Sequence, residues 1–190
     1  SNVELPLFAE LANKHGMSIV GTHYDFDKII HDPKATMALH DKLGTKNVGI
    51  GGMPGDARGS YDALMKFIEA FNSAAALYSK EGYKLTYHNH SFEFVKSHEN
   101  KTMMDYLVEQ LDPQNVSFVL DTCWVSAAGG DPVDWIKKLA GRIDILHLKD
   151  MTLSPKDELY RLTEVGYGNL AFDPIMKAAE ETNVQYYVVE

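Results

Sequence analysis

The strongest constraint in this sequence is a repeated alternation between stretches with helical periodicity and short apolar runs rich in β-branched residues. Such alternation is typical of βα units, which build a parallel sheet covered by helices. No long polar linker interrupts the pattern. We therefore expect residues 1–190 to form a single α/β domain.

Capping signals support the boundaries of these segments. Asp32 is suited to cap a helix, and Pro33 and Pro132 stand where the first helical turn tolerates proline. The expected helices are 5–15, 33–43, 61–80, 102–110, 132–139 and 174–181. The expected strands are 17–22, 46–50, 84–89, 116–120, 143–148 and 185–189.

Composition restricts the classes of partner. A net charge of −9 argues against nucleic-acid binding, because phosphate backbones are held by clustered Lys and Arg. The apolar runs are too short for a membrane span, so no membrane partner is expected. The single cysteine, Cys123, suits a reducing compartment. We expect a cytoplasmic protein, although removal of a leader to the periplasm would leave the same sequence. Formation of a homo-oligomer stays open.

Polar side chains collect where the predicted strands end. Such strand ends carry His23, His88, Asn89, His90, Asp121, His147 and Glu190. Because the carboxyl ends of parallel strands meet at one face, these side chains are expected to converge. Asp and Asn also cap helices and form turns at such places, which is the simpler explanation for any one of them. Five strand ends rich in His, Asp and Glu favour a shared site.

Three segments carry a resemblance to a known family. Residues 87–94 read Tyr-His-Asn-His-Ser-Phe-Glu-Phe, residues 120–124 read Leu-Asp-Thr-Cys-Trp, and residues 141–150 contain Gly-Arg followed by His-Leu-Lys-Asp. In this order the motifs resemble those of the sugar phosphate isomerase/epimerase family in the xylose isomerase-like TIM barrel superfamily. The resemblance implies a (β/α)₈ barrel, which has eight strands. The sequence would supply about six of them, the second to the seventh, so the domain is expected to be truncated at both ends.

The resemblance also implies a divalent-metal site. The family's two glutamates, aspartate and histidine match Glu93, Asp121, His147 and Glu190. Three carboxylates and an imidazole suit Mn, Co, Mg or Zn better than an ion that prefers thiolates. Because Glu93 lies a few residues beyond its strand, a histidine could replace it as a ligand. In the alternative that we favour, His88 and His90 face the substrate as proton carriers.

A metal held in this way would bind two neighbouring sugar oxygens and acidify the C–H bond beside a carbonyl. The resemblance then implies a sugar isomerase or epimerase that acts through an enediolate. The catalytic candidates are Glu190, Glu93, His90, His88 and Lys149, of which Lys149 would stabilise charge on the substrate oxygen. The substrate-binding candidates are His23, Trp124 and Asp150.

Three other functions use the same features. A lyase, dehydratase or hydrolase of keto-sugars or 3-keto-glycosides would keep the metal site and change only the fate of the intermediate. A non-catalytic sugar-binding barrel would keep the fold without the reaction. Abasic-site endonucleases share the barrel, but they need several metals and a basic DNA face, which the acidic composition disfavours.

Overall fold

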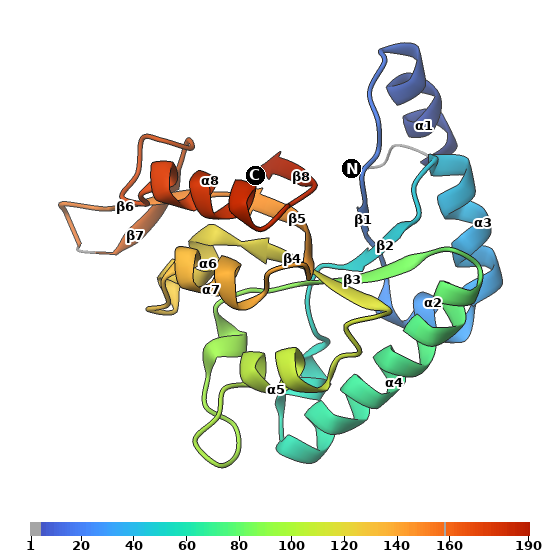
Figure 1. Ribbon diagram of the computed structural model, residues 1–190, viewed down its shortest axis with the longest axis horizontal. Helices are drawn as coiled ribbons and strands as arrows, with labels where there is room; N and C mark the ends of the chain where they lie inside the picture. The colour runs from blue at the N-terminus through green and yellow to red at the C-terminus, as the bar shows by residue number, and fades with distance from the viewer. Residues whose placement is uncertain (1–4, 158) are drawn as a thin grey trace. The chain divides into compact units, whose positions relative to one another are not determined.

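The structure is a computed structural model that describes residues 5–157 and 159–190. The chain divides into two compact units. The first runs to Tyr87 and includes Leu111–Val116, and the second comprises His88–Gln110 and Ser117–Glu190. Figure 1 shows the order of the helices and strands along the chain.

The first unit is built on parallel strands. β1 pairs with β2 through Thr22 and Val48, and β2 pairs with β3 through Asn47 and Lys84. The elements are α1 (Leu5–Lys14), β1 (Thr22–His23), α2 (Phe26–His31), α3 (Pro33–Leu43), β2 (Asn47–Ile50), the 3₁₀ turn η1 (Gly55–Arg58), α4 (Tyr61–Lys80) and β3 (Lys84–His88). The last residue of β3 belongs to the second unit.

The core of the first unit depends on one face of α4. Its buried side chains recur at helical spacing, which gives the helix a continuous apolar stripe. Phe67 and Phe71 stack with ring centroids 5.7 Å apart, and Tyr87 of β3 meets Phe71 edge-on at 6.4 Å. The buried Tyr78 hydroxyl donates to the carbonyl of Ile29, so the one polar atom of this ring is satisfied.

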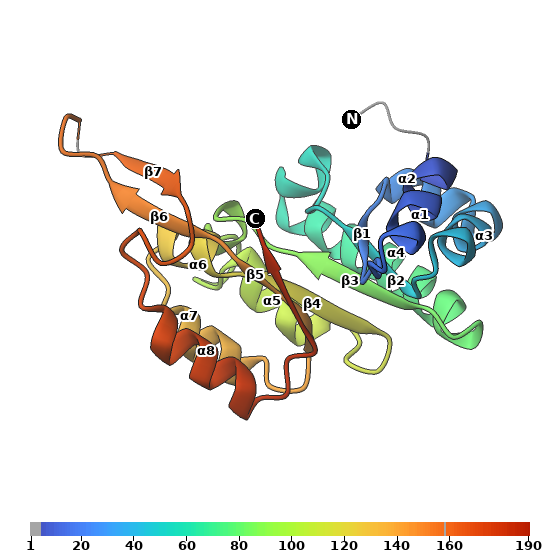
Figure 2. The same cartoon turned by 90° about the horizontal axis from the view of Figure 1, so that it is seen from above.

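The second unit has the parallel order β4, β5, β8 and an antiparallel pair, β6 and β7. All residues of β4 and β5 are buried, which explains why both strands are mostly apolar and show no regular alternation of apolar and polar residues. The elements are η2 (Phe92–Phe94), α5 (Met103–Gln110), β4 (Val116–Asp121), α6 (Thr122–Ala127), α7 (Pro132–Lys138), β5 (Ile143–Leu148), β6 (Asp150–Leu153), β7 (Tyr160–Thr163), α8 (Phe172–Glu181) and β8 (Tyr186–Val189). Figure 2 shows α7 and α8 side by side.

The structure confirms the βα alternation and most of the expected elements. Asp32 caps α3 through the Ala35 amide, and Pro33 and Pro132 begin their helices as expected. The expected strand 17–22 is wrong except for Thr22, since β1 comprises only Thr22–His23. One reason is visible at Val20, whose carbonyl accepts from the Asn47 side chain.

Two α-helices and one β-hairpin, besides the two 3₁₀ turns, were not expected from the sequence. The helices α2 and α6 are each only six residues long, too short for periodicity to reveal them. The β6–β7 hairpin lies in a polar stretch without a clear apolar run, and its apolar residues Leu153, Tyr160 and Leu162 are exposed in the structure. Figure 2 shows this hairpin projecting from β5 and α6.

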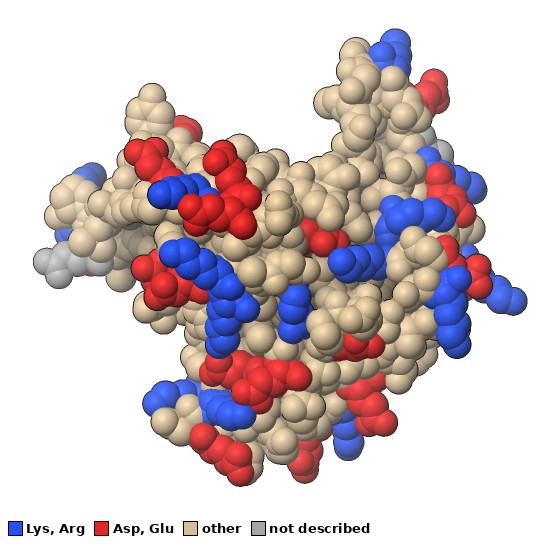
Figure 3. Space-filling view, in the orientation of Figure 1, with Lys and Arg blue, Asp and Glu red and all other residues tan. Residues whose placement is uncertain are grey.

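The charged surface is mixed in sign. On the face shown in Figure 3, Asp and Glu side chains lie among Lys and Arg side chains rather than in separate areas. In the part of the chain that the structure describes, no helix combines the length and the apolar character needed to cross a bilayer.

The strands around Gly49 leave no space for a side chain at this position. A Cβ at this position would lie 2.3 Å from the Thr22 carbonyl oxygen and 2.6 Å from Thr86 Oγ1. Since the backbone oxygen cannot move without disturbing the β1–β2 ladder, Gly49→Ala should lower the free energy of unfolding by about 1–3 kcal/mol. Urea unfolding measures this change. Gly55→Ala is the control, because a Cβ at Gly55 meets nothing within 4 Å, and equal effects of the two changes would contradict the argument.

His40 should make stability depend on pH. The ring is fully buried, with Nδ1 donating to the Thr36 carbonyl at 2.7 Å and Nε2 lying 2.8 Å from the Thr22 hydroxyl oxygen. Burial lowers the pKa of His40, and the Thr36 bond and the charge of Asp41 only partly oppose this. Below about pH 6.5 the imidazole therefore binds a proton more readily in the unfolded chain than in the folded chain. The free energy of unfolding should fall as the pH drops below this value, and His40 should not affect it at higher pH.

His40→Gln should flatten this acid-side slope, as measured by urea unfolding across a pH series. His31→Gln changes an exposed histidine at the end of α2 and is the matched control. A slope that His40→Gln leaves unchanged would rule out the buried imidazole as its source.

Candidate metal centre

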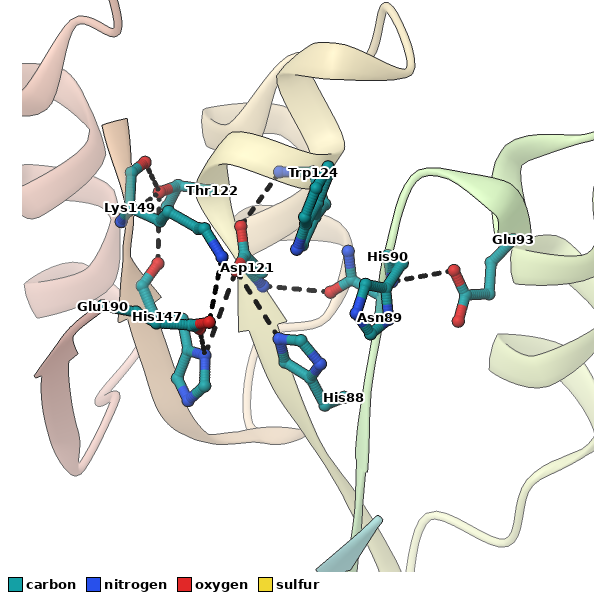
Figure 4. Close-up of polar contacts among 10 residues, drawn as sticks. All are labelled: His88, Asn89, His90, Glu93, Asp121, Thr122, Trp124, His147, Lys149 and Glu190. Carbon is teal, nitrogen blue, oxygen red and sulfur yellow. Dashed lines mark hydrogen bonds and ion pairs between the residues drawn. The ribbon is translucent and has the colours of Figure 1, made fainter. Parts of the chain in front are cut away.

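The site begins with the register of the second sheet. Asp121 ends β4 directly opposite His147 of β5, and the Glu190 amide continues the ladder beyond β8 by donating to the Leu148 carbonyl. The ends of three adjacent parallel strands therefore deliver an aspartate, a histidine and a glutamate to one edge. His88, the last residue of β3, adds a second imidazole (Figure 4).

Four potential metal ligands converge at this edge. One ligand atom from each of His88, Asp121, His147 and Glu190 lies within 4.8 Å of the other three. His147 Nδ1 is 2.7 Å from Glu190 Oε2, and Asp121 Oδ2 is 3.5 Å from His88 Nε2. His88, Asp121 and His147 are buried, whereas the Glu190 side chain is 43% exposed. The cluster is thus open to solvent on the Glu190 side.

The two oxygens of Asp121 have different surroundings. Oδ1 accepts from the Trp124 amide at 2.9 Å and so caps α6. Oδ2 is buried and has no hydrogen-bond partner among the described residues. A buried carboxylate oxygen is costly unless a cation or a donor compensates it. A divalent cation would meet this need, so the residues present fit the metal that the motifs imply.

The protonation of two members suits cation binding. Burial lowers the pKa of His147, and nearby His88 lowers it further, which together outweigh Glu190 and Asp121. For Glu190, burial alone would raise the pKa, but the hydrogen bond and charge of Lys149 outweigh it and hold the pKa below its usual value. A neutral imidazole and an ionised carboxylate are the forms that coordinate a metal.

One wall of the cluster is aromatic and cationic. Lys149 Nζ lies 2.9 Å from Glu190 Oε1 and 5.0 Å from the centroid of the Trp124 ring. On the other side of Trp124 the His90 ring lies 5.5 Å away, and His90 is also 4.8 Å from the His88 ring. An imidazole, an indole and an ammonium group thus border the candidate ligands, a set that could contact a polar ring with apolar C–H faces.

Comparison with known proteins identifies the family. The family model described as xylose isomerase-like TIM barrel matches residues 4–190. The chain belongs to this family. The resemblance seen in the motifs and the expected α/β TIM barrel class are thereby confirmed.

Similar proteins are named for different activities. The chain is 28% identical over 134 residues to an inosose dehydratase from Clostridium perfringens, an alignment that covers 64% of this chain and 44% of that protein. A sugar phosphate isomerase/epimerase from Parabacteroides distasonis has a TM-score of 0.79 at 24% identity, covering all of this chain and 74% of the other. The IOLI protein with a bound zinc atom has a TM-score of 0.71 at 18% identity, covering 100% and 73%. The chain spans less than half the length of the dehydratase, and the structural matches show the fold alone.

Glu93 lies apart from the four clustered side chains. It is buried in η2, and its Oε2 accepts from the His90 amide at 2.8 Å (Figure 4). Among the described residues, the group of four ligands contains His88 where the motif implied Glu93. The short 3₁₀ turn after β3 accounts for this difference, because it directs the carboxylate back to the backbone of the preceding loop.

Asp150 holds a loop rather than facing the four ligands. Its carboxylate accepts from the amides of Met151, Gly166, Gly168 and Leu170, and it is fully buried. A Cβ at Gly168 would lie 2.2 Å from Asp150 Oδ1, so the loop approaches this closely only because residue 168 is glycine. Asp150 thereby ties the segment after β7 to the start of β6.

One further candidate, His23, and the single cysteine have clear positions. His23 ends β1 in the first unit, and its role toward substrate stays a prediction. Cys123 is buried, and burial raises the pKa of its thiol to about 11, so it stays protonated. It is not in the group of four.

Two buried polar residues beside the cluster were missed as site residues. Asn89 Oδ1 accepts from the Asp121 amide at 3.0 Å, and the Thr122 hydroxyl contacts the backbone of His147 and Lys149. Asn89 is one of the polar residues at the predicted strand ends, and Thr122 directly follows the proposed ligand Asp121. Only the strand register reveals what these side chains touch.

Removal of the Asp121 charge should abolish tight metal binding. Asp121→Asn keeps an oxygen for the Trp124 amide but replaces the buried anionic ligand, so affinity for Mn²⁺ or Zn²⁺ should fall by more than about 100-fold. Isothermal titration calorimetry measures the affinity, and the stabilisation by added metal in thermal unfolding should disappear.

Asp131→Asn is the control for this change. Asp131 also caps a helix in the second unit, through the Val133 amide, but it is not one of the four ligands. Its substitution removes the same charge and should leave metal affinity near the parent value. If both variants bind metal like the parent, the four side chains do not form a metal site.

Proposed function

We propose that this chain carries the metal site of an enzyme that removes a proton from the carbon beside a carbonyl of a sugar-like ketone, with loss of water as the outcome. The convergence of His88, Asp121, His147 and Glu190 carries this proposal. The match to inosose dehydratase supports dehydration over the isomerisation that the motifs first implied. Dehydratases are lyases, and the sequence motifs are compatible with a lyase that uses the same metal site as an alternative to an isomerase or epimerase.

The proposed ligands are two imidazoles and two carboxylates. This set suits Zn²⁺, Mn²⁺ or Co²⁺ better than Mg²⁺, which prefers oxygen ligands and water. When bound, the ion would act as a Lewis acid that polarises the substrate carbonyl. The zinc atom of the structurally similar IOLI protein supports a divalent ion of this kind. His88 is then the fourth ligand in place of Glu93.

His90 is the proposed proton carrier. Its ring centroid lies 5.5 Å from that of Trp124 and 5.6 Å from that of Phe92, and its amide donates to the Glu93 carboxylate. Glu190 is less suited to this role, because Lys149 holds its pKa low and so weakens it as a base. Glu93 thereby acts on the reaction through the position of His90.

Lys149 and Trp124 would shape the binding of substrate. The Lys149 ammonium group is close to both Glu190 and the Trp124 ring, where it could stabilise negative charge on a substrate oxygen. The Trp124 ring offers an apolar surface to the C–H face of a polyhydroxylated ring. These two contacts favour a cyclic ketone with several hydroxyl groups.

The proposed reaction balances without an oxidant or a second substrate. His90 takes the proton as the C–H bond beside the carbonyl breaks. It then gives this proton to the hydroxyl group on the next carbon, whose C–O bond breaks to release water. A carbon–carbon double bond forms between the two carbons, so the product differs from the substrate by one water molecule.

Isomerisation or epimerisation is the second candidate. It shares the proton-abstraction step, and it differs only in returning the proton to carbon instead of to a leaving hydroxyl group. The motifs at residues 87–94, 120–124 and 141–150, which resemble those of sugar phosphate isomerases/epimerases, favour it. Product mass separates the two outcomes.

The metal-loaded protein should dehydrate a keto-inositol. We would incubate it with a panel of inososes, ketoses and 3-keto-glycosides in deuterated water and analyse the products by mass spectrometry. Loss of one water from an inosose is the expected result, whereas a product that loses no water and carries one deuterium in place of a carbon-bound hydrogen would indicate isomerisation or epimerisation. Protein that binds metal and sugar yet produces neither change would be a non-catalytic binder.

His90→Gln should affect catalysis without affecting metal binding. Loss of the proton carrier should lower kcat by about 10²- to 10⁴-fold, while metal affinity stays near the parent value. His98→Gln alters a histidine in the exposed loop before α5 and should leave both quantities unchanged. Equal kcat for His90→Gln and the parent would remove His90 from the mechanism.

A further inference from the structure

A single buried hydroxyl group joins the ends of β4 and β5 at the metal centre. Thr122 follows Asp121, and its Oγ1 lies 3.1 Å from the His147 carbonyl oxygen and 3.0 Å from the Lys149 carbonyl oxygen. The Lys149 amide donates to the same Oγ1 at 3.3 Å. Thr122 is fully buried, so water does not compete for these bonds.

Lys149 depends on this hydroxyl because it belongs to neither neighbouring strand. β5 ends at Leu148 and β6 begins at Asp150, so Lys149 lies at the break where the chain leaves the parallel sheet. Buried amide and carbonyl groups need partners, and a side chain commonly supplies them where a ladder stops. Thr122 contacts both backbone groups of Lys149.

The position of Thr122 gives the bond a consequence for the ligands. It is covalently joined to Asp121, and its hydroxyl donates to the His147 carbonyl and accepts from the Lys149 amide (Figure 4). Thr122 therefore links the backbone of Asp121 to the backbone carbonyl of His147, and both of these residues are proposed ligands. Groups that orient ligands in this way commonly change metal affinity when they are removed.

We propose that Thr122 is a positioning residue. It sets the separation of Asp121 and His147, and it orients the Lys149 side chain toward Glu190. This inference rests on the proposed metal site. The Thr122 hydroxyl acts through the backbone and does not itself touch the metal or the substrate.

Thr122→Val is the direct test, since valine keeps the shape of threonine and removes only its hydrogen-bonding capacity. Affinity for Mn²⁺, measured by calorimetry, should fall by about 10- to 100-fold. The visible absorption bands of bound Co²⁺ should shift, because they report ligand geometry. The Lys149 amide should exchange faster with deuterium in the metal-free protein. Thr122→Ser keeps the hydroxyl group and should restore all three properties toward the parent values.

Thr182→Val is the matched control. The Thr182 hydroxyl also bonds two backbone carbonyls in the second unit, those of Ala178 and Ala179 at the end of α8. Its removal should leave metal affinity and the Co²⁺ spectrum unchanged. If Thr122→Val does not fold, the pair Thr122→Ser and Thr122→Ala makes the same comparison at a smaller side-chain volume, with the loss expected only for alanine.

The outcomes separate this inference from the proposed function. Parent protein that binds metal tightly, together with Thr122→Val or Thr122→Ala that binds equally well and shows the parent Co²⁺ spectrum, overturns the positioning role alone. Parent protein that binds no divalent metal overturns the metal site and this inference together. Loss of affinity in Thr122→Ser as large as in Thr122→Val would assign the effect to packing and would also reject the role of the hydroxyl.

Discussion

The register of β4 against β5 is the constraint on which the rest of the site depends. It places Asp121 opposite His147, and the next strand, β8, brings Glu190 to the same edge. A shift of one residue in a strand would turn its side chains to the other face, and the carboxylate and imidazole would no longer meet. The complete burial of β4 and β5 protects this register, because a shift would displace buried side chains on both faces of the sheet at once.

The converging carboxylates place negative charge in a largely buried site, and this charge needs compensation. Asp121 is fully buried with one oxygen that has no hydrogen-bond donor among the described residues, and Glu190 is ionised beside it. Lys149 balances part of this charge from the Glu190 side. A positive ion between the carboxylates would complete the balance, which is why the same geometry that costs stability on its own favours a metal.

Much of this organisation could be predicted from the sequence. The βα alternation gave the fold class, and the habit of parallel strands to end at one face pointed to Asp121, His147 and Glu190 before any coordinates. Motif spacing matched Glu93 to a ligand, but it could not show that a 3₁₀ turn directs the Glu93 carboxylate to the His90 amide while His88 joins the group of four. Thr122 and Asn89 were beyond sequence reasoning for a related reason, since their bonds cross between strands far apart in the chain.

The Asp150 carboxylate has an evolutionary implication. Four backbone amides converge on it, and the absence of a side chain at Gly168 leaves the space that its oxygens fill. A larger residue at 168 and an acidic residue at 150 therefore exclude each other on steric grounds. Substitution at either position removes the reason to retain the other, so the two residues should persist or disappear as a pair among homologues that keep this loop.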